Sequence, residues 1–151
     1  MKIPTDLEEL VAVSRRLGAN RALVLHGGGN TSVKTTGRDA AGRRLAVLHV
    51  KGSGRDLGEV EARDLPALAL EPLLALRELR TLSDADMVKA LSAARLDPEA
   101  PLPSVETLLH VFLPHKYVLH THADAVLALT DQPAGETLCR KVFGARTIVA
   151  P

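Results

Sequence analysis

The stretch VLHTHADAV, residues Val118 to Val126, places two histidines two positions apart in an otherwise apolar run. Tyr117 and the first five residues of this stretch form a predicted strand, YVLHTH, in which alternate side chains point to the same face. The rings of His120 and His122 should therefore lie close together on one side of a sheet, at a spacing that suits two ligands of one Zn²⁺. Two interpretations stay open from these residues alone: a metal pair, or two histidines satisfied by backbone carbonyls or water.

A helix is expected immediately before this strand, over residues 105–113. Ser104 is its predicted N-cap, and Pro114 should end it. Glu106 and His110 are four residues apart and should share one helix face. A carboxylate beside a metal can act as a general base, whereas the alternative is a first-turn glutamate that complements the helix dipole.

Two glycine-rich loops could bring backbone close to a ligand. GGGNTS covers Gly27–Ser32 and KGSG covers Lys51–Gly54. With the side chains of Asn30 and Ser32, they could form a cradle for an anion such as phosphate, or they could be two turns at hairpin ends. Neither loop is a P-loop, and the first is not a dinucleotide fingerprint because a hairpin rather than a helix is expected after it.

The rest of the chain predicts a single mixed α/β domain, because helical and strand patterns alternate through its 151 residues. The other expected elements are a helix at 5–18, a strand at 22–26, a hairpin with strands in 32–36 and 43–52, short or broken elements over 57–80, a helix at 83–96, a helix at 135–144 and a strand at 145–151.

Composition excludes several functional classes. Aromatic residues make up 2% of the chain, and 19 basic residues are balanced by 18 acidic ones, so neither a base-stacking surface nor a basic patch for nucleic acid is expected. Cys139 is the one cysteine, which rules out a disulfide framework and a cysteine-type zinc site. No signal-like or membrane-spanning apolar segment is visible, so we expect a cytoplasmic protein that binds no membrane.

The motifs GGGNTSVK, KGSG, PSVETLLHVFLPHKYVLHTHADAVLAL and GETLCRKVFG, in this order, resemble the class II aldolase/adducin superfamily. The branch that they resemble most is the aldolase domain of bifunctional rhamnulose-1-phosphate aldolase/short-chain dehydrogenase proteins. The resemblance covers nearly the whole chain. It implies a three-layer α/β/α fold with a mainly antiparallel central sheet, and a homo-oligomer, which is a tetramer in the family.

The same resemblance implies a role for each motif. His120 and His122 match the family's ligands of a divalent metal, usually Zn²⁺, and Glu106 matches its acid/base residue. Simple sugar-phosphate aldolases often carry a second serine after Ser104, where this chain has Val105. The residues that the resemblance assigns to the substrate phosphate are Asn30, Ser32, Ser53, Gly54 and Ser104.

The implied reaction is metal-dependent retro-aldol cleavage of a ketose 1-phosphate. Rhamnulose 1-phosphate is the implied substrate, and dihydroxyacetone phosphate and lactaldehyde are the implied products. A sugar-phosphate epimerase or a dehydratase of the same fold is an alternative. So is a non-catalytic, adducin-like interaction module, although adducin heads lack the metal motif that this chain keeps.

Residues 1–151 are expected to form an incomplete class II aldolase-like domain. The last predicted strand stops at Pro151, and no histidine follows His122 to serve as the third metal ligand that the resemblance implies. We therefore expect this chain to be the N-terminal portion of a longer protein, with the final strands, the third histidine and any dehydrogenase domain outside it.

Overall fold

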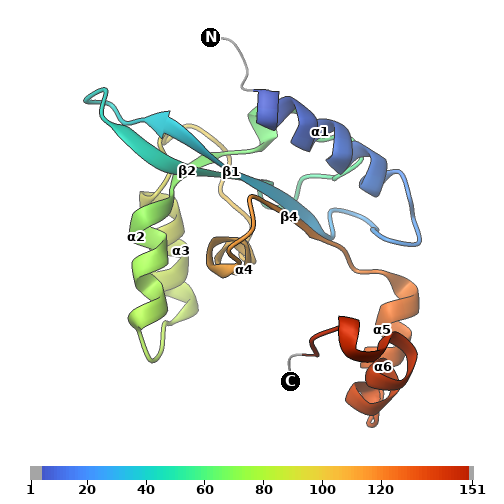
Figure 1. Cartoon of the computed structure of the whole chain (residues 1–151). Coiled ribbons are helices and arrows are strands. Elements are labelled where there is room, and N and C mark those ends of the chain that lie inside the picture. Colours follow the sequence, from blue (N-terminus) through green and yellow to red (C-terminus); the bar gives the residue numbers. More distant parts are fainter. Residues whose placement is uncertain (1–4, 150–151) are drawn as a thin grey trace.

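The computed structural model describes residues 5–149, and its centre is a four-stranded antiparallel sheet in the order β3-β2-β1-β4 (Figure 1). The strands are β1 (Asn30–Arg38), β2 (Arg44–Val50), β3 (Ala67–Ala69) and β4 (Tyr117–His120). β1 and β2 form the predicted hairpin. β4 returns from far along the chain to the free side of β1, which sets Asn30 opposite His120.

Helices cover both faces of this sheet (Figure 1). α1 lies on one face, and α2, α3 and α4 pack on the other. The helices are α1 (Thr5–Gly18), α2 (Leu70–Leu74), α3 (Asp84–Ala93), α4 (Thr107–Phe112), α5 (Asp124–Thr130) and α6 (Gly135–Phe143), with 3₁₀ turns η1 (Ala62–Asp64), η2 (Ala75–Glu78) and η3 (Gly144–Arg146). The predicted three-layer α/β/α arrangement with an antiparallel sheet is therefore confirmed.

Alternation along the strands divides the core into two apolar clusters. Val33 points to the face that α1 covers, where it packs with Leu7 and Leu10. Leu48 and Val50 point to the opposite face, where they meet apolar side chains of α2, α3 and α4. Because side chains alternate with a period of two, neighbouring residues of β1 contact different layers. Polar positions on the α4 face of β1 are thus directed into the protein interior.

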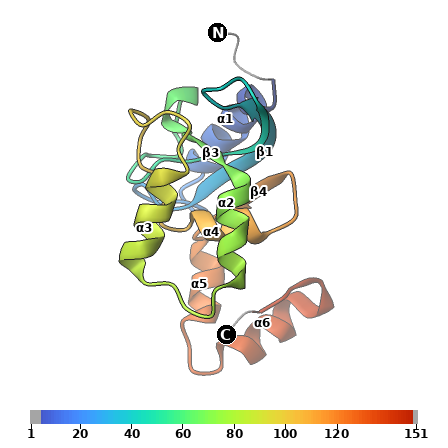
Figure 2. The same cartoon turned by 90° about the vertical axis from the view of Figure 1, so that its left-hand side faces the viewer.

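Helices α5 and α6 lie beyond the end of β4, apart from the layered body (Figures 1 and 2). They pack against each other, with Cys139 buried as a free thiol. α6 was predicted from the sequence, but α5 was not. Within residues 5–149, no helix is both long and apolar enough to cross a bilayer.

The strand predicted at 22–26 is not formed. The amides of Leu23 and Val24 donate instead to the carbonyl of Asn20, 2.9 and 3.2 Å away, which makes turns. The carbonyl of Leu23 accepts the amide of His122 at 3.0 Å. Residues 22–26 therefore form turns that hold the segment around His122 by a backbone hydrogen bond. A short apolar run in the sequence does not distinguish such turns from a strand.

Several other boundaries also differ from prediction, and three of these differences concern the site or the C-terminal end. α4 begins at Thr107 with Glu106 at the N-cap position, because Ser104 and its neighbours form a preceding turn. β4 ends at His120, since its partner strand begins at Asn30. The final predicted strand at 145–151 is absent over 147–149, which pair with none of the described strands, and residues 150–151 lie outside the described range.

Replacing Leu10 by Ala should destabilise the packing of α1 on the sheet. Leu10 is fully buried beside Val33, so its truncation should lower the free energy of unfolding by about 2–5 kcal/mol. Urea unfolding followed by circular dichroism measures the change. Leu79→Ala is the matched control, because Leu79 is 52% exposed and its loss should cost no more than about 0.5 kcal/mol. Equal effects from the two variants would contradict the assigned core.

Candidate functional site

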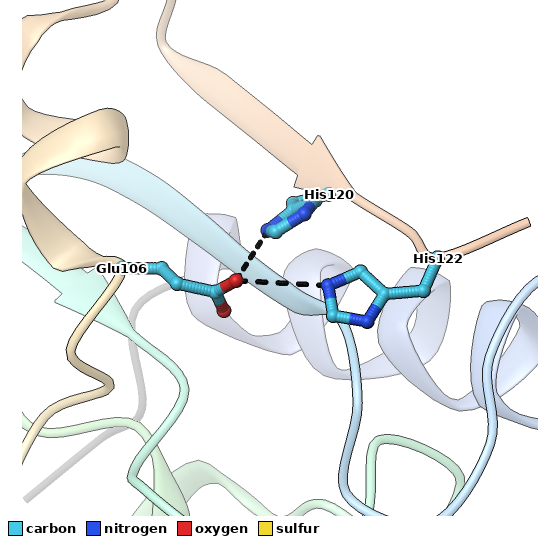
Figure 3. Close-up of side chains that lie close together, drawn as sticks. All are labelled: Glu106, His120 and His122. Atoms are coloured by element: carbon cyan, nitrogen blue, oxygen red, sulfur yellow. Dashed lines mark ion pairs between the residues drawn. The ribbon is translucent and has the colours of Figure 1, made fainter. Parts of the chain in front are cut away.

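Glu106, His120 and His122 come together although they belong to different segments of the chain (Figure 3). The Oε1 atom of Glu106 lies 3.7 Å from Nδ1 of His120 and 3.6 Å from Nε2 of His122. One ligand atom from each of the three residues falls within a group no wider than 4.8 Å. The two imidazole rings are tilted by 57°, with centroids 4.8 Å apart. The rings thus converge on the same side, as predicted, although His122 lies beyond the end of β4 and is placed by the bond of its amide to the carbonyl of Leu23.

The first glycine loop is what allows backbone to approach this cluster. Gly29 has φ +63°, a conformation that glycine adopts without strain. A Cβ atom there would lie 2.8 Å from the carbonyl oxygen of His120, too close for any other residue. At Gly28 a Cβ would meet the ring of His122 at 3.5 Å. The loop therefore packs directly behind the histidine pair.

The His120 ring has the properties of a metal ligand. Burial lowers its pKa most, neighbouring His122 lowers it further, and Glu106 opposes both effects. A lowered pKa favours the neutral ring, which is the form that binds cations. Its Nδ1 atom is buried and makes no hydrogen bond, since 3.7 Å to Glu106 is too long for one.

The donor set and its spacing fit a divalent cation. Two imidazoles and a carboxylate are common zinc ligands, and with Zn–N and Zn–O bonds of about 2.0–2.2 Å the neighbouring ligand atoms of a tetrahedral site lie about 3.3–3.6 Å apart. The separations of 3.6 and 3.7 Å lie at or slightly above that spacing, and the three ligand atoms together span up to 4.8 Å, so the side chains would move slightly inward around a bound cation. A cation would also provide the partner that the buried Nδ1 of His120 lacks.

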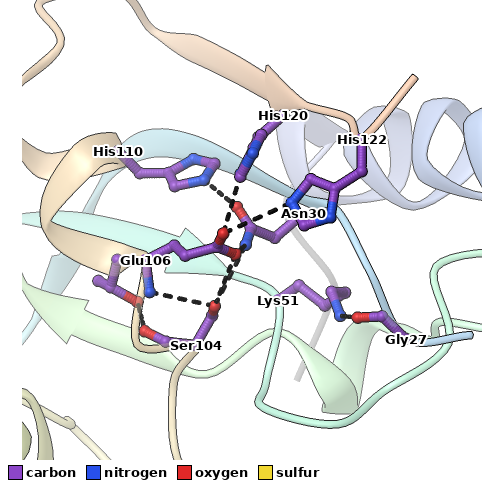
Figure 4. A network of polar contacts seen from close by, with 9 residues as sticks. Gly27, Asn30, Lys51, Ser104, Glu106, His110, His120 and His122 are labelled. Carbon is purple, nitrogen blue, oxygen red and sulfur yellow. Dashed lines mark hydrogen bonds and ion pairs between the residues drawn. The ribbon is translucent and has the colours of Figure 1, made fainter. Parts of the chain in front are cut away.

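The other carboxylate oxygen of Glu106 is tied to a separate polar network (Figure 4). Its Oε2 atom accepts a hydrogen bond from Nδ2 of Asn30 and another, at 3.5 Å, from Oγ of Ser104. Nδ2 of Asn30 also donates to Oγ of Ser104 at 3.1 Å. The backbone amide of Glu106 donates to the same hydroxyl at 3.3 Å. One oxygen of the carboxylate is therefore anchored, and the other faces the histidines.

His110 lies behind Asn30, on the α4 side of the sheet. Its Nε2 contacts Oδ1 of Asn30, and its Nδ1 lies 2.8 Å from Oγ of Ser32. The ring is fully buried, and burial is the main reason that its pKa falls to about 4. Because both ring nitrogens are occupied within the protein, His110 is not placed to complete a metal site.

Lys51 links the two glycine loops. Its side chain is buried, and its Nζ donates to the carbonyl oxygens of Gly27 at 2.9 Å and Arg55 at 2.6 Å (Figure 4). Burial lowers its pKa, an effect that the charges of Glu106 and Asp56 partly offset. The second loop also joins the segment before α4, because the amide of Ser104 donates to the carbonyl of Lys51 at 3.2 Å.

The predicted site residues fall into three groups. Glu106, His120 and His122 form the cluster, and the side chains of Asn30 and Ser104 contact its carboxylate. Ser53 and Gly54 lie exposed on the second loop, where Gly54 has φ +70°. Ser32 is fully buried beside His110.

Sequence reasoning gave His110 no role beyond sharing a helix face with Glu106, and it did not name Lys51 as a site residue. The i, i+4 relation of His110 to Glu106 was a signal for the first. Lysines are mostly exposed, so nothing in the sequence marked the second as buried.

A cavity of about 1160 Å³ lies elsewhere, along the segment from Gly54 to Ala67. It is lined by His49, Arg55 and several acidic side chains, and it includes none of the three clustered residues. Its only predicted site residue is Gly54. The converging histidines and carboxylate, rather than this hollow, mark the candidate site.

The comparisons with known proteins agree with this architecture. Residues 8–150 match the family described as class II aldolase and adducin N-terminal domain. A solved N-terminal class II aldolase domain of a conserved protein from Thermoplasma acidophilum superposes with a TM-score of 0.87 at 44% identity, over 95% of this chain and 67% of that one.

A longer relative is also similar in sequence. The uncharacterized oxidoreductase YuxG of Bacillus subtilis (strain 168) is 40% identical over 150 residues, which is 99% of this chain. The chain spans 22% of the length of that relative. A family match over nearly all of the sequence, in a protein with this layered fold, means that the chain belongs to the class II aldolase and adducin N-terminal domain family.

Proposed function

We propose that this chain is the N-terminal part of a metal-dependent class II aldolase that cleaves a ketose 1-phosphate by a retro-aldol reaction. The proposed substrate is rhamnulose 1-phosphate, and the products are dihydroxyacetone phosphate and lactaldehyde. We place the protein in the cytoplasm and expect it to act as a homo-oligomer. The observation that carries the proposal is the position of Glu106 Oε1, within 3.7 Å of both histidine rings.

His120 and His122 are the residues that would hold the metal, Zn²⁺ or another divalent ion. When bound, the metal would supply a Lewis acid that draws electron density from the substrate's carbonyl and hydroxyl oxygens as the C–C bond breaks. The neutral state favoured at His120 leaves its buried Nδ1 available as a ligand. Tight binding also requires a third protein ligand or bound water, which we assign to a residue of the longer protein outside this chain or to solvent.

Glu106 is the proposed acid/base residue. Cleavage of the C3–C4 bond removes a proton from the hydroxyl on C4 and leaves an electron pair on C3 that takes up a proton. Oε1 of Glu106 faces the histidine pair and is the atom placed to carry that proton. Oε2 is held by Asn30 and Ser104, so the carboxylate keeps one orientation during the transfer.

The substrate phosphate is proposed to bind where the two glycine loops meet the segment before α4. Ser53 and Gly54 offer an exposed turn, and Asn30 and Ser104, which the family resemblance also assigns to the phosphate, are buried polar side chains that bond to each other. Lys51 adds positive charge beneath the loops. Backbone amides and a lysine in such loops attract anions, and anchoring the phosphate would hold the reacting carbons over Glu106.

The choice of rhamnulose 1-phosphate depends on the branch that the sequence resembles. The Bacillus subtilis relative is described as an oxidoreductase and is far longer than this chain. A dehydrogenase region fused to an aldolase domain would account for both properties. A substrate panel tests the choice: release of dihydroxyacetone phosphate supports an aldolase, whereas epimerised or dehydrated sugar phosphate would assign another reaction to the same site.

Glu106→Gln should lower kcat for cleavage of rhamnulose 1-phosphate by about 10²–10⁴-fold, because the amide cannot transfer the proton. A coupled assay for dihydroxyacetone phosphate on the full-length protein measures the rate. Glu136→Gln is the control, since Glu136 is an exposed residue of α6 whose partner is Arg140. A Glu106→Gln enzyme with the kcat of the wild type would refute the assigned role.

His122→Gln should reduce the amount of divalent metal that purifies with the full-length protein, because it removes one of the two proposed histidine ligands. Elemental analysis gives the metal content, and a chelator should abolish cleavage in the wild type. His115→Gln serves as the matched control, since His115 is exposed and outside the cluster. Wild-type protein without bound metal would argue against a metal-dependent enzyme.

A further inference from the structure

We propose that His110 is a positioning residue that orients the amide of Asn30 so that its NH₂ group, and not its oxygen, faces Glu106. The inference rests on the proposed function in one respect, which is the catalytic role of Glu106. The orientation itself follows from hydrogen bonds among Ser32, His110 and Asn30, none of which is a proposed metal ligand. Ser32, which the sequence assigned to the substrate phosphate, takes part as the residue that holds the His110 ring.

The geometry places His110 between two residues of one strand. Asn30 and Ser32 are two positions apart on β1, so both point toward α4. The His110 ring extends from α4 and contacts both side chains. Its Nε2 atom meets Oδ1 of Asn30 (Figure 4), and its Nδ1 atom lies 2.8 Å from Oγ of Ser32. The exposed fractions of Asn30, Ser32 and His110 are 1%, 0% and 0%. Water therefore cannot replace these contacts.

The donors and acceptors can be arranged in one consistent way. The amide oxygen of Asn30 can only accept, so Nε2 of His110 must carry the proton. In a neutral ring Nδ1 is then an acceptor, and the hydroxyl of Ser32 donates to it. The pKa of about 4, which burial lowers, agrees with a neutral ring at pH 7. The order of donation thus runs from Ser32 to His110 to Asn30.

This order decides how Asn30 meets the catalytic carboxylate. With its oxygen held by His110, the NH₂ group of Asn30 is directed at Oε2 of Glu106 and at Oγ of Ser104. A flipped amide would bring its oxygen against the carboxylate, where two acceptors repel each other. Without the ring, the amide oxygen of Asn30 loses its donor, so the amide is held less firmly and its bond to Glu106, which keeps Oε1 toward the histidines, is weakened. His110 acts on Glu106 only through Asn30.

The first test reads the tautomer directly, without substrate or metal. Imidazole ¹⁵N chemical shifts of the histidine-labelled full-length protein, with His110 assigned by its loss in His110→Phe or His110→Gln, distinguish a protonated Nε2 from a protonated Nδ1. We expect the neutral Nε2–H form at pH 7. An Nδ1–H tautomer or an imidazolium ion at that pH would overturn the inference.

The second test separates kcat from KM. His110→Phe keeps a planar ring but removes both nitrogens, and it should lower kcat by about 10–100-fold with little change in KM. His110→Gln can still donate to Asn30 and should recover most of that loss. Ser32→Ala should lower kcat by a smaller factor and leave KM unchanged. A raised KM with unchanged kcat in Ser32→Ala would instead place Ser32 at the phosphate and contradict its role here.

The two proposals can fail separately. If the wild type shows the Nε2–H tautomer but cleaves no sugar phosphate, the aldolase assignment fails while the orientation of Asn30 stands. If the wild type is active and His110→Phe, folded by circular dichroism, keeps its kcat, the positioning role fails while the aldolase assignment stands.

Discussion

The antiparallel pairing of β1 with β4 is the constraint on which the site depends. It sets Asn30 opposite His120 and so brings a glycine loop from early in the chain against the histidine segment from much later. Gly29 makes the approach possible, because any Cβ would collide with the carbonyl of His120. Backbone hydrogen bonds fix this register, since a slip of one residue would turn His120 to the face that α1 covers.

With this register, the two carboxylate oxygens of Glu106 have different neighbours. One carboxylate oxygen receives hydrogen bonds from Asn30 and Ser104, while the other faces two imidazoles across 3.6 and 3.7 Å. The hydrogen-bond donors to Oε2 hold the carboxylate in place and leave Oε1 directed at the two imidazoles. A carboxylate held in this way can exchange protons without losing its orientation, which suits acid–base chemistry beside a metal.

How much could be predicted from the sequence differs between elements. The hairpin and α1 were predicted well, because periodic apolar residues and turn residues specify them locally. The segment at 22–26 was mistaken for a strand, since its hydrogen bonds depend on Asn20 and on the arrival of His122. The grouping of Glu106 with the histidines was anticipated through a family resemblance, whereas the burial of Lys51 and of the Ser32–His110 pair was not.

The sequence by itself determined the chemical inventory: two histidines spaced to share one face, a glutamate ahead of them, and glycines where backbone must come close. Local spacing indicates these features, because the periods of helices and strands follow from backbone geometry, although His122 lies past the end of β4 and owes its place to a bond with Leu23. Only the tertiary structure decided which polar atoms of these residues form hydrogen bonds with one another. Ser32 faces His110 because α4 packs on that side of β1, a contact between residues 78 positions apart that no local rule contains.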